Sequence, residues 1–282
     1  MARCHVCFRH CELKDGAVGF CGARTAENGR VTALNYGRVT ALALDPVEKK
    51  PLSRFCPGSM ILSVGSFGCN LRCPFCQNHD ISWSEEAGRY AATARTLSPR
   101  DLTDLALGTK IRGNIGIAFT YNEPLIGYEY VLDTAKLAKN EGLKTVMVTN
   151  GTAELPVLAE LAPYIDAMNI DLKGFTDRYY KQVLGGSRKQ VMAFIEEAVK
   201  HCHVELTTLI VPGGNDGEEE MRELASWVGR FRNPDGEGVP LHISRFFPRF
   251  RMTDRAATPV ETVYRLAEIA REHLAYVYPG NC

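Results

Sequence analysis

The sequence predicts an α/β protein in which a parallel sheet is covered by helices and preceded by a small cysteine-rich module. From residue 60 onward, short β-rich runs alternate with amphipathic helical stretches. About six such strand–helix units follow one another, a pattern typical of parallel sheets. Seven of the ten cysteines, by contrast, fall in two tight clusters, at residues 4–21 and 69–76.

Six segments carry the strand pattern, and a seventh candidate follows near the end of the chain. The seven candidates are residues 60–67, 114–120, 144–150, 167–173, 203–211, 240–246 and 274–279. Apolar residues at helical spacing predict helices at 127–142, 187–201 and 258–273. Ser98 and Thr258 each precede a proline, so we expect each to cap the start of a helix.

These units fit a curved barrel and an open doubly wound sheet equally well. In both folds, ligands bind at the carboxyl ends of the strands. A three-cysteine loop follows the first predicted strand, and polar motifs close the next five: YNEP (121–124), TNGT (149–152), DLKGF (171–175), VPGGND (211–216) and SRFFPRF (244–250). We therefore predict the functional site at this edge of the sheet.

Residues 1–59 are predicted to form a separate metal-binding module and connector, and residues 60–282 the α/β domain. The module is rich in Cys, Gly and Arg and holds one β-like stretch, at 30–44, before a proline-containing connector at 45–59. Cys4, Cys7, Cys11 and Cys21 have the spacing C-x2-C-x3-C-x9-C. Four thiolates can close a zinc site or hold an auxiliary iron–sulfur cluster, and both remain open.

The composition is that of an ordinary soluble enzyme, with 45% hydrophobic and 23% charged residues. Lys plus Arg and Asp plus Glu both number 33, so no basic excess indicates a nucleic-acid partner. No stretch is long and apolar enough to predict a membrane segment, and we expect a cytoplasmic protein. In that reducing compartment the cysteine clusters indicate metal ligation rather than disulfides. Cys56, Cys202 and Cys282 stand alone.

The loop GCNLRCPFCQN (68–78) places Cys69, Cys73 and Cys76 in the spacing C-x3-C-x2-C. Structural zinc sites have four protein ligands, and most 4Fe-4S clusters have four thiolates, one on each iron. Either a further ligand such as His79 or Cys56 closes a zinc site here, or one iron of a cluster stays free to bind another molecule. The spacing alone leaves both readings open.

Three cysteines in this spacing after the first strand of a βα-repeat protein resemble the radical S-adenosylmethionine (SAM) superfamily. The motifs CNLRCPFCQN, YNEP, TNGT, DLKGF and VPGGND, in that order, are similar to its glycyl-radical-enzyme activase branch, typified by pyruvate formate-lyase activating enzyme. The AmmeMemoRadiSam radical SAM enzymes, which also begin with a cysteine-rich segment, are the most similar subgroup. The resemblance covers nearly the whole chain and implies a partial (β/α)6 barrel.

The resemblance also implies cofactors and chemistry. A 4Fe-4S cluster is reduced by a low-potential electron donor of the flavodoxin or ferredoxin type. SAM chelates the free iron through its amino and carboxylate groups and is cleaved to a 5′-deoxyadenosyl radical, which abstracts hydrogen from a substrate. The activase branch implies that this substrate is a protein. The alternatives are radical modification of a nucleic acid or small molecule, and a zinc-binding interaction protein without catalysis.

Roles for single residues follow from the same resemblance. Cys69, Cys73 and Cys76 would hold the cluster, and Phe75 would lie near the adenine of SAM. Glu123 would receive the SAM amino group, as a carboxylate can accept charge-assisted bonds from an ammonium. The alternative for Glu123 is stabilisation of a helix N-terminus.

Four further residues are assigned in the same way. Asn150 and Gly151 would contact the ribose or carboxylate of SAM, unless they only form an Asn-Gly turn. Asp171 and Lys173 point to the same face of a strand. Lys173 would bind the SAM carboxylate with Asp171 organising it, unless the two merely pair with each other.

Two positions depart from the activase pattern. Val148 stands where an acidic or polar residue often precedes TNG, and Thr207 stands where activases tend to carry an arginine. Both departures weaken the expectation of a glycyl substrate and leave cluster and SAM binding unaffected.

Overall fold

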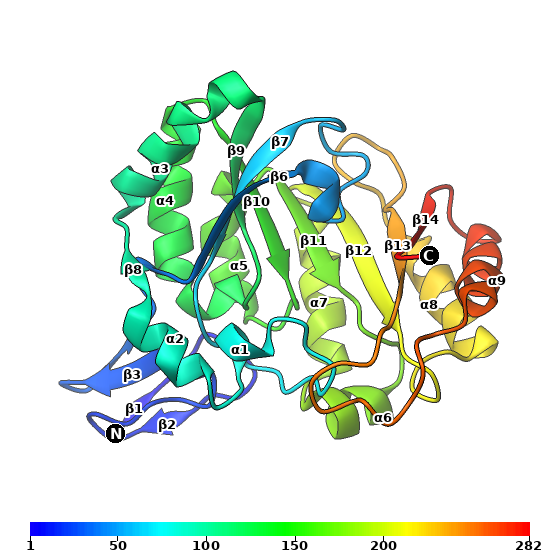
Figure 1. Ribbon diagram of the computed structural model, residues 1–282, viewed down its shortest axis with the longest axis horizontal. Helices are drawn as coiled ribbons and strands as arrows, with labels where there is room; N and C mark the ends of the chain where they lie inside the picture. Colours follow the sequence, from blue (N-terminus) through cyan, green and yellow to red (C-terminus); the bar gives the residue numbers. More distant parts are fainter.

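The computed structural model describes residues 1–282 and is built around one eight-stranded sheet of order β14-β13-β12-β11-β10-β9-β7-β6 (Figure 1). Strand β6 (Ala41–Pro46) runs antiparallel to its neighbour β7 (Met60–Gly65), and the other pairings are all parallel. The remaining strands are β9 (Asn114–Phe119), β10 (Lys144–Thr149), β11 (Ala167–Asp171), β12 (His203–Ile210), β13 (Leu241–Arg245) and β14 (Val277–Gly280). All seven predicted strands are confirmed.

The strand order decides between the two folds that the sequence left open. From β7 to β14 the parallel strands follow one another in the sheet in their order along the chain. Because strand–helix–strand crossovers are right-handed, an order that never reverses places every connecting helix on the same face. The sheet therefore curls with its helices outside. Its edge strands β6 and β14 do not pair with each other, so the fold is a partial barrel.

Six helices cover the outer face of the sheet: α3 (Pro99–Gly108), α4 (Tyr128–Asn140), α5 (Leu155–Leu161), α7 (Arg188–Ala198), α8 (Glu218–Val228) and α9 (Val260–Arg271). The short helices α1 (His79–Ser82), α2 (Ala87–Thr93) and α6 (Asp177–Tyr179) lie in loops at the carboxyl ends of the strands. The predicted helices at 127–142, 187–201 and 258–273 are confirmed as α4, α7 and α9. None of the helices combines the length and the apolar character needed to cross a bilayer.

Of the two predicted helix caps, one is confirmed and one is wrong. Ser98 forms a capping box with Asp101 at the start of α3. Thr258 does not cap α9, which begins at Val260 with Pro259 as its N-cap residue. The buried Thr258 hydroxyl instead donates to the Ile210 carbonyl at 2.6 Å and accepts from the Phe246 N–H at 3.2 Å. It therefore ties together the carboxyl ends of two neighbouring strands.

The N-terminal segment contributes strands to three small antiparallel pairs, of which the first lies at the lower left of Figure 1 together with β3. They are β1 (Ala2–Arg3) with β2 (Glu12–Leu13), β3 (Arg24–Glu27) with β4 (Arg30–Ala33), and β5 (Arg38–Val39) with β8 (Arg95–Thr96). The predicted boundary between residues 59 and 60 runs between β6 and β7, which pair along their whole lengths. Residues 41–46 are thus part of the barrel wall.

Two separate apolar clusters show how the barrel is filled. The larger cluster joins the outer faces of the strands to the helices. The smaller one lies inside the amino end of the barrel, where Val47 and Leu52 pack against inward-facing residues of four strands: Ile61, Ala118, Val146 and Ala167. The segment between β6 and β7 therefore plugs the amino end, which leaves only the carboxyl end for a ligand.

Glu205 holds this plug from inside the barrel. Its carboxylate is fully buried and accepts hydrogen bonds from the Ser53 and Arg54 N–H groups at 3.0 and 2.7 Å. The Nε2 atoms of His203 and His242 lie 3.0 and 2.7 Å from the same carboxylate. Burial alone would raise the pKa of Glu205, but these donors lower it to about 2. The charged form of Glu205 therefore stabilises the fold.

We expect Glu205→Gln to lower the free energy of unfolding by about 3 kcal/mol at neutral pH. Each carboxylate oxygen accepts one backbone N–H, so an amide must turn its own NH2 group toward one of these donors. The stabilisation by Glu205 is present above its unfolded pKa of about 4.3 and is lost as the pH falls toward 2. Denaturant unfolding of the wild type and of Glu205→Gln should therefore show that the difference between their free energies of unfolding becomes smaller below about pH 5.

Glu197→Gln is the matched control, because Glu197 also contacts two basic side chains, Lys200 and His201, but on the surface. It should change stability by less than about 1 kcal/mol. Equal effects of the two substitutions would contradict the role assigned to Glu205.

Candidate active site

The cysteine loop, Gly68–Asn78, begins just after β7 and lies at the carboxyl ends of the parallel strands. The N-terminal segment contacts its first residues, since the Cys69 N–H donates to the Cys21 carbonyl at 3.1 Å. Gly68 has φ of +92°, and a Cβ there would lie 2.7 Å from the Cys21 carbonyl oxygen and from Cβ of Ala23. Glycine is therefore required at the point where the two segments meet.

A buried polar network ties the cysteine loop to the end of β10. The Asn150 side chain donates to Asn70 Oδ1 at 2.9 Å, and Asn70 donates to the Thr152 hydroxyl at 2.8 Å. Thr152 in turn donates to Asn150 Oδ1 through its N–H and its hydroxyl. Cys69 Sγ accepts from the Leu71 N–H at 3.4 Å and from Asn150 Nδ2 at 3.8 Å. The network thus orients one thiol of the loop.

Asn150 and Gly151 therefore have structural roles in addition to their predicted contacts with SAM. The side chain of Asn150 is 5% exposed and bonds within the protein through both its oxygen and its nitrogen. Gly151 has φ of +64°, and a Cβ there would lie 2.8 Å from the Ile170 side chain. A side chain at position 151 would strain the backbone and clash with β11.

Glu123 lies beneath the cysteine loop and is already hydrogen-bonded by the protein. Its Oε1 accepts from the Thr149 hydroxyl at 2.6 Å and from the Leu125 N–H at 3.1 Å, and its Oε2 accepts from the Asn150 N–H at 2.8 Å. It is the N-cap residue of a short 3-10 helix, Pro124–Gly127. Three donors occupy most of the roughly four acceptor positions of a carboxylate. Glu123 therefore has the helix-start role, and one acceptor position on its Oε2 stays free for the predicted contact with SAM.

Asp171 and Lys173 form an ion pair near the thiols, with 2.7 Å between Lys173 Nζ and Asp171 Oδ2. The Lys173 N–H also donates to the Tyr180 hydroxyl oxygen at 3.1 Å. Burial alone would lower the pKa of Lys173, but Asp171 and the Cys73 thiolate raise it well above its ordinary value. Lys173 is therefore a fixed positive charge at the mouth of the barrel.

Burial dominates the electrostatics of the loop thiols. It raises the pKa of Cys69, and the nearby Glu123 carboxylate raises it further. It raises the pKa of Cys73 to about 12 and also raises that of Cys76, while Lys173 opposes both shifts. A metal ion would deprotonate such thiols on binding, because thiolates are the ligating form.

The segment after β13 folds over the cysteine loop. Its Arg251 N–H donates to the Pro74 carbonyl at 2.9 Å, and its Phe250 stacks on the His79 ring with 4.1 Å between centroids. Phe75, predicted to lie near adenine, is 5% exposed and meets Phe246 edge-on at 6.4 Å. One wall of the site is therefore aromatic.

The two residues proposed to close a zinc site with the loop do not reach it. Cys56 precedes β7, so it lies at the amino end of the barrel, about 20 Å along that strand from the cysteine loop. His79 is held in its stack with Phe250. No three His, Cys, Asp or Glu side chains anywhere in the chain converge closely enough to hold a single metal ion.

The four N-terminal cysteines line one small cavity beside the cysteine loop. The cavity is closed by Arg9, Arg24, Asn70 and Ile126, among other residues. The structure thus brings Cys4, Cys7, Cys11 and Cys21 together, although not around a single ion-sized point.

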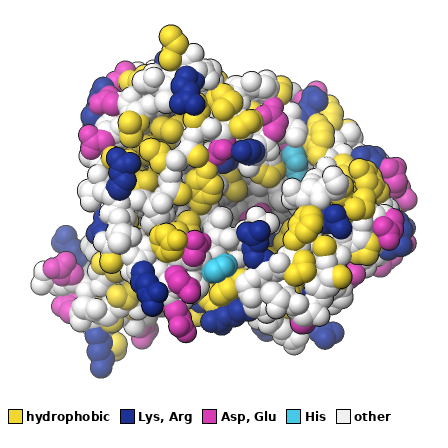
Figure 2. All heavy atoms as spheres, viewed as in Figure 1, with side chains coloured by type: hydrophobic (Ala, Val, Ile, Leu, Met, Phe, Trp, Pro, Cys, Tyr) yellow, Lys and Arg dark blue, Asp and Glu magenta, His cyan; other side chains and the backbone are white.

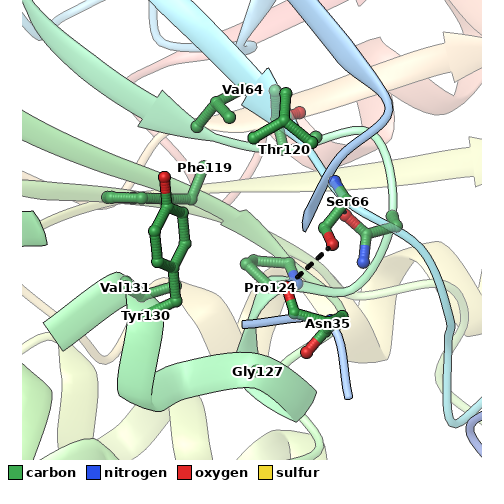
Figure 3. Close-up of a pocket in the computed structure, with 12 residues that line it drawn as sticks. Asn35, Val64, Ser66, Phe119, Thr120, Pro124, Gly127, Tyr130 and Val131 are labelled. Atoms are coloured by element: carbon green, nitrogen blue, oxygen red, sulfur yellow. Dashed lines mark hydrogen bonds between the residues drawn. The ribbon is translucent and has the colours of Figure 1, made fainter. Parts of the chain in front are cut away.

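Three other hollows lie at or near the barrel. A wide groove of about 640 Å³ borders the cysteine loop and is lined by Arg72, Trp83, Lys181 and Arg251, among others. Figure 2 shows that the molecule is also hollowed between β6–β7 and β13–β14, on the open side of the barrel. A smaller cavity between β7, β9 and α4 includes Ser66 and Tyr130 and none of the predicted site residues (Figure 3).

Sequence reasoning missed several residues that build the site: Arg9, Asn70, Thr149, Thr152 and Tyr180. Asn70 and Thr152 lie inside the motifs CNLRC and TNGT, so an amide or hydroxyl next to a predicted ligand was an available signal. Arg9 and Tyr180 offered no such signal, because each acts across a contact between distant segments.

Comparisons with known proteins agree with this architecture. Residues 63–228 match the family model described as the radical SAM superfamily. An uncharacterized protein of Methanocaldococcus jannaschii is 41% identical over 99% of this chain and 81% of its own length. The pyruvate formate-lyase-activating enzyme of Clostridium pasteurianum is 30% identical over 62% of this chain and 72% of its own length.

Solved structures show the same fold at low sequence identity. A radical SAM methyltransferase from Sphaerobacter thermophilus has a TM-score of 0.57 at 17% identity, covering 80% of this chain and 67% of that one. Streptococcus suis SuiB bound to S-adenosylmethionine has a TM-score of 0.58 at 14% identity, covering 76% and 48%. Because the family model spans more than half of the chain, and its curated relatives include activating enzymes, the chain is an enzyme that belongs to the radical SAM superfamily.

Proposed function

We propose that Cys69, Cys73 and Cys76 hold a 4Fe-4S cluster at which SAM is reductively cleaved, and that the resulting radical abstracts hydrogen from a protein. One observation carries the proposal: a single loop places three buried or half-buried thiols at the only unplugged end of a parallel barrel. Cys56 lies at the other end of the barrel and His79 does not converge with the three thiols, which leaves one cluster position for SAM.

The residues around the loop fit such a cluster. Cluster sulfurs are stabilised by N–H donors, and Cys69 Sγ already accepts two of them. The three thiols do not converge on one ion-sized point, as expected when each binds a different iron. Lys173 supplies a positive charge beside Cys73, where a cluster and its thiolates carry net negative charge.

When bound, the cluster supplies one electron, which cleaves SAM to methionine and a 5′-deoxyadenosyl radical. The electron comes from a low-potential donor of the flavodoxin or ferredoxin class. Hydrogen transfer to that radical yields 5′-deoxyadenosine and leaves the unpaired electron on the substrate.

The protein's own groups would bind and orient SAM. Lys173 would donate to the SAM carboxylate, with its ammonium paired to Asp171 and its backbone N–H bonded to the Tyr180 hydroxyl. Glu123 has one acceptor position left on Oε2 for the SAM amino group. Phe75 contributes to the aromatic wall that would border the adenine. Asn150 acts through Asn70 and Cys69 and is therefore a positioning residue.

Two observations favour a protein substrate. Curated relatives are activating enzymes for pyruvate formate-lyase, which is itself a protein. The groove beside the cysteine loop is wide, and Arg72, Lys181 and Arg251 line it. A groove of this kind can accept an extended segment of a partner chain, whereas a small metabolite is normally enclosed.

Cys73→Ala should abolish formation of 5′-deoxyadenosine by anaerobically reconstituted protein supplied with SAM and a reductant. The substitution removes one of three cluster ligands, so the iron bound by the loop should also be lost. Product is measured by chromatography, and iron and sulfide by chemical analysis.

Cys56→Ala is the matched control, because that thiol lies at the opposite end of the barrel. This substitution should leave the formation of 5′-deoxyadenosine and the iron content unchanged. Wild-type protein that carries a full cluster complement and cleaves no SAM would overturn the proposal. Colourless, zinc-loaded protein prepared without oxygen would instead support the non-catalytic zinc alternative.

Deuterium should pass from the substrate to 5′-deoxyadenosine when the enzyme acts on a proteome labelled with α-deuterated glycine. A glycyl α-hydrogen is the atom that an activase-like enzyme would abstract, and the label reports its transfer directly by mass spectrometry. A proteome labelled with deuterated leucine is the control and should give unlabelled product. SAM cleavage without label from glycine, but stimulated by RNA or a metabolite pool, would favour the alternative substrates.

A further inference from the structure

The cavity lined by Cys4, Cys7, Cys11 and Cys21 lies outside the site described so far. We propose that these four thiols hold a second 4Fe-4S cluster, which receives the electron from the external donor and passes it to the cluster of the cysteine loop. The relay rests on the proposed function, whereas the second cluster itself does not.

The cavity wall contains a buried cation with an unused donor. Arg24 lines the cavity, and its side chain is 5% exposed. Its terminal nitrogens bond Glu129 at 2.6 Å and the Ile126 carbonyl at 2.9 Å, but its Nε has no partner. A buried N–H of a charged group without an acceptor is costly. An anionic ligand in the cavity would supply that acceptor, and a cluster with four thiolates is such an anion.

The spacing of the thiols favours a cluster over zinc. Zinc binds sulfur at about 2.3 Å, so four thiols around one zinc ion must converge on a single point. These four do not, and neither do Cys69, Cys73 and Cys76. A 4Fe-4S cluster takes one thiolate on each iron and therefore needs the sulfurs further apart, around a volume. The four cysteine side chains line one common cavity instead of meeting at a single point, which is the arrangement that a cluster requires.

The two cysteine groups are in direct contact. The Cys21 carbonyl accepts from the Cys69 N–H at 3.1 Å, so one hydrogen bond joins a residue of each group. A second link runs from Arg9, between Cys7 and Cys11, whose Nε donates to the Asn70 carbonyl at 2.8 Å. A structural metal would not need this proximity, whereas an electron relay does.

The proposed step is a transfer of one electron at each stage. The external donor is oxidised by one electron as the N-terminal cluster is reduced from the 2+ to the 1+ state. That cluster returns to 2+ as the cluster of the cysteine loop is reduced to 1+. No bond forms or breaks, and no proton is required.

Metal content of two anaerobically reconstituted variants tests the second cluster independently of SAM chemistry. We expect about eight iron atoms in each wild-type chain and about four in the variant Cys69→Ser/Cys73→Ser/Cys76→Ser. The four that remain should give the Mössbauer spectrum of a 4Fe-4S cluster. Cys7→Ser/Cys21→Ser should also retain about four, held by the cysteine loop. Zinc in the triple variant, or no metal in it while its near-ultraviolet circular dichroism is that of the wild type, would overturn the proposal.

Electron paramagnetic resonance and reduction kinetics test the relay. Reduced wild-type protein should show two interacting signals, and Cys7→Ser/Cys21→Ser should show one. Reduction of the remaining cluster by a reduced flavodoxin should be slower in this variant than in wild type, with Cys202→Ser as the control. An unchanged rate would overturn the relay and leave the metal-content result standing. Wild-type protein that carries both clusters but does not cleave SAM would instead overturn the proposed function.

Discussion

The attachment of the cysteine loop to the end of β10 is the constraint on which the site depends. The loop between Gly68 and Asn78 buries Leu71 and Phe75 in the core, but it has no regular secondary structure over its cysteines. Asn70, Asn150 and Thr152 fix it instead through buried hydrogen bonds, in which each polar group has a partner. Such fully satisfied networks specify one geometry, because any rearrangement leaves a buried polar group unpaired.

Glu123 extends the same constraint into the sheet. Its carboxylate receives the Thr149 hydroxyl and the Asn150 N–H, so it fixes the strand end from which Asn150 reaches the loop. Burial raises the pKa of Glu123 to about 7, although these donors oppose the shift. The plug at the other end of the barrel, held by Glu205, leaves the loop end as the only approach.

The N-terminal segment packs directly against this site. Its Cys21 contacts Cys69 where Gly68 leaves no room for a side chain, and its Arg9 reaches Asn70. Strand β6, within the same 59 residues, completes the barrel edge. The cysteine-rich segment and the loop therefore share backbone contacts despite the separation of about 50 residues between Cys21 and Cys69.

The sequence by itself determined the seven parallel strands, the helices α4, α7 and α9, and the positions of the polar motifs at the strand ends. These features depend on periodicity and on capping residues that lie close together in the chain. Only the tertiary structure decided that the sheet is a partial barrel, that Glu123 and Asn150 are bonded within the protein, and that Cys56 lies far from the loop. The tertiary structure also decided that the Thr258 hydroxyl bonds to β12 and does not cap α9. Each of these outcomes depends on contacts between segments distant in the chain, which no local pattern encodes.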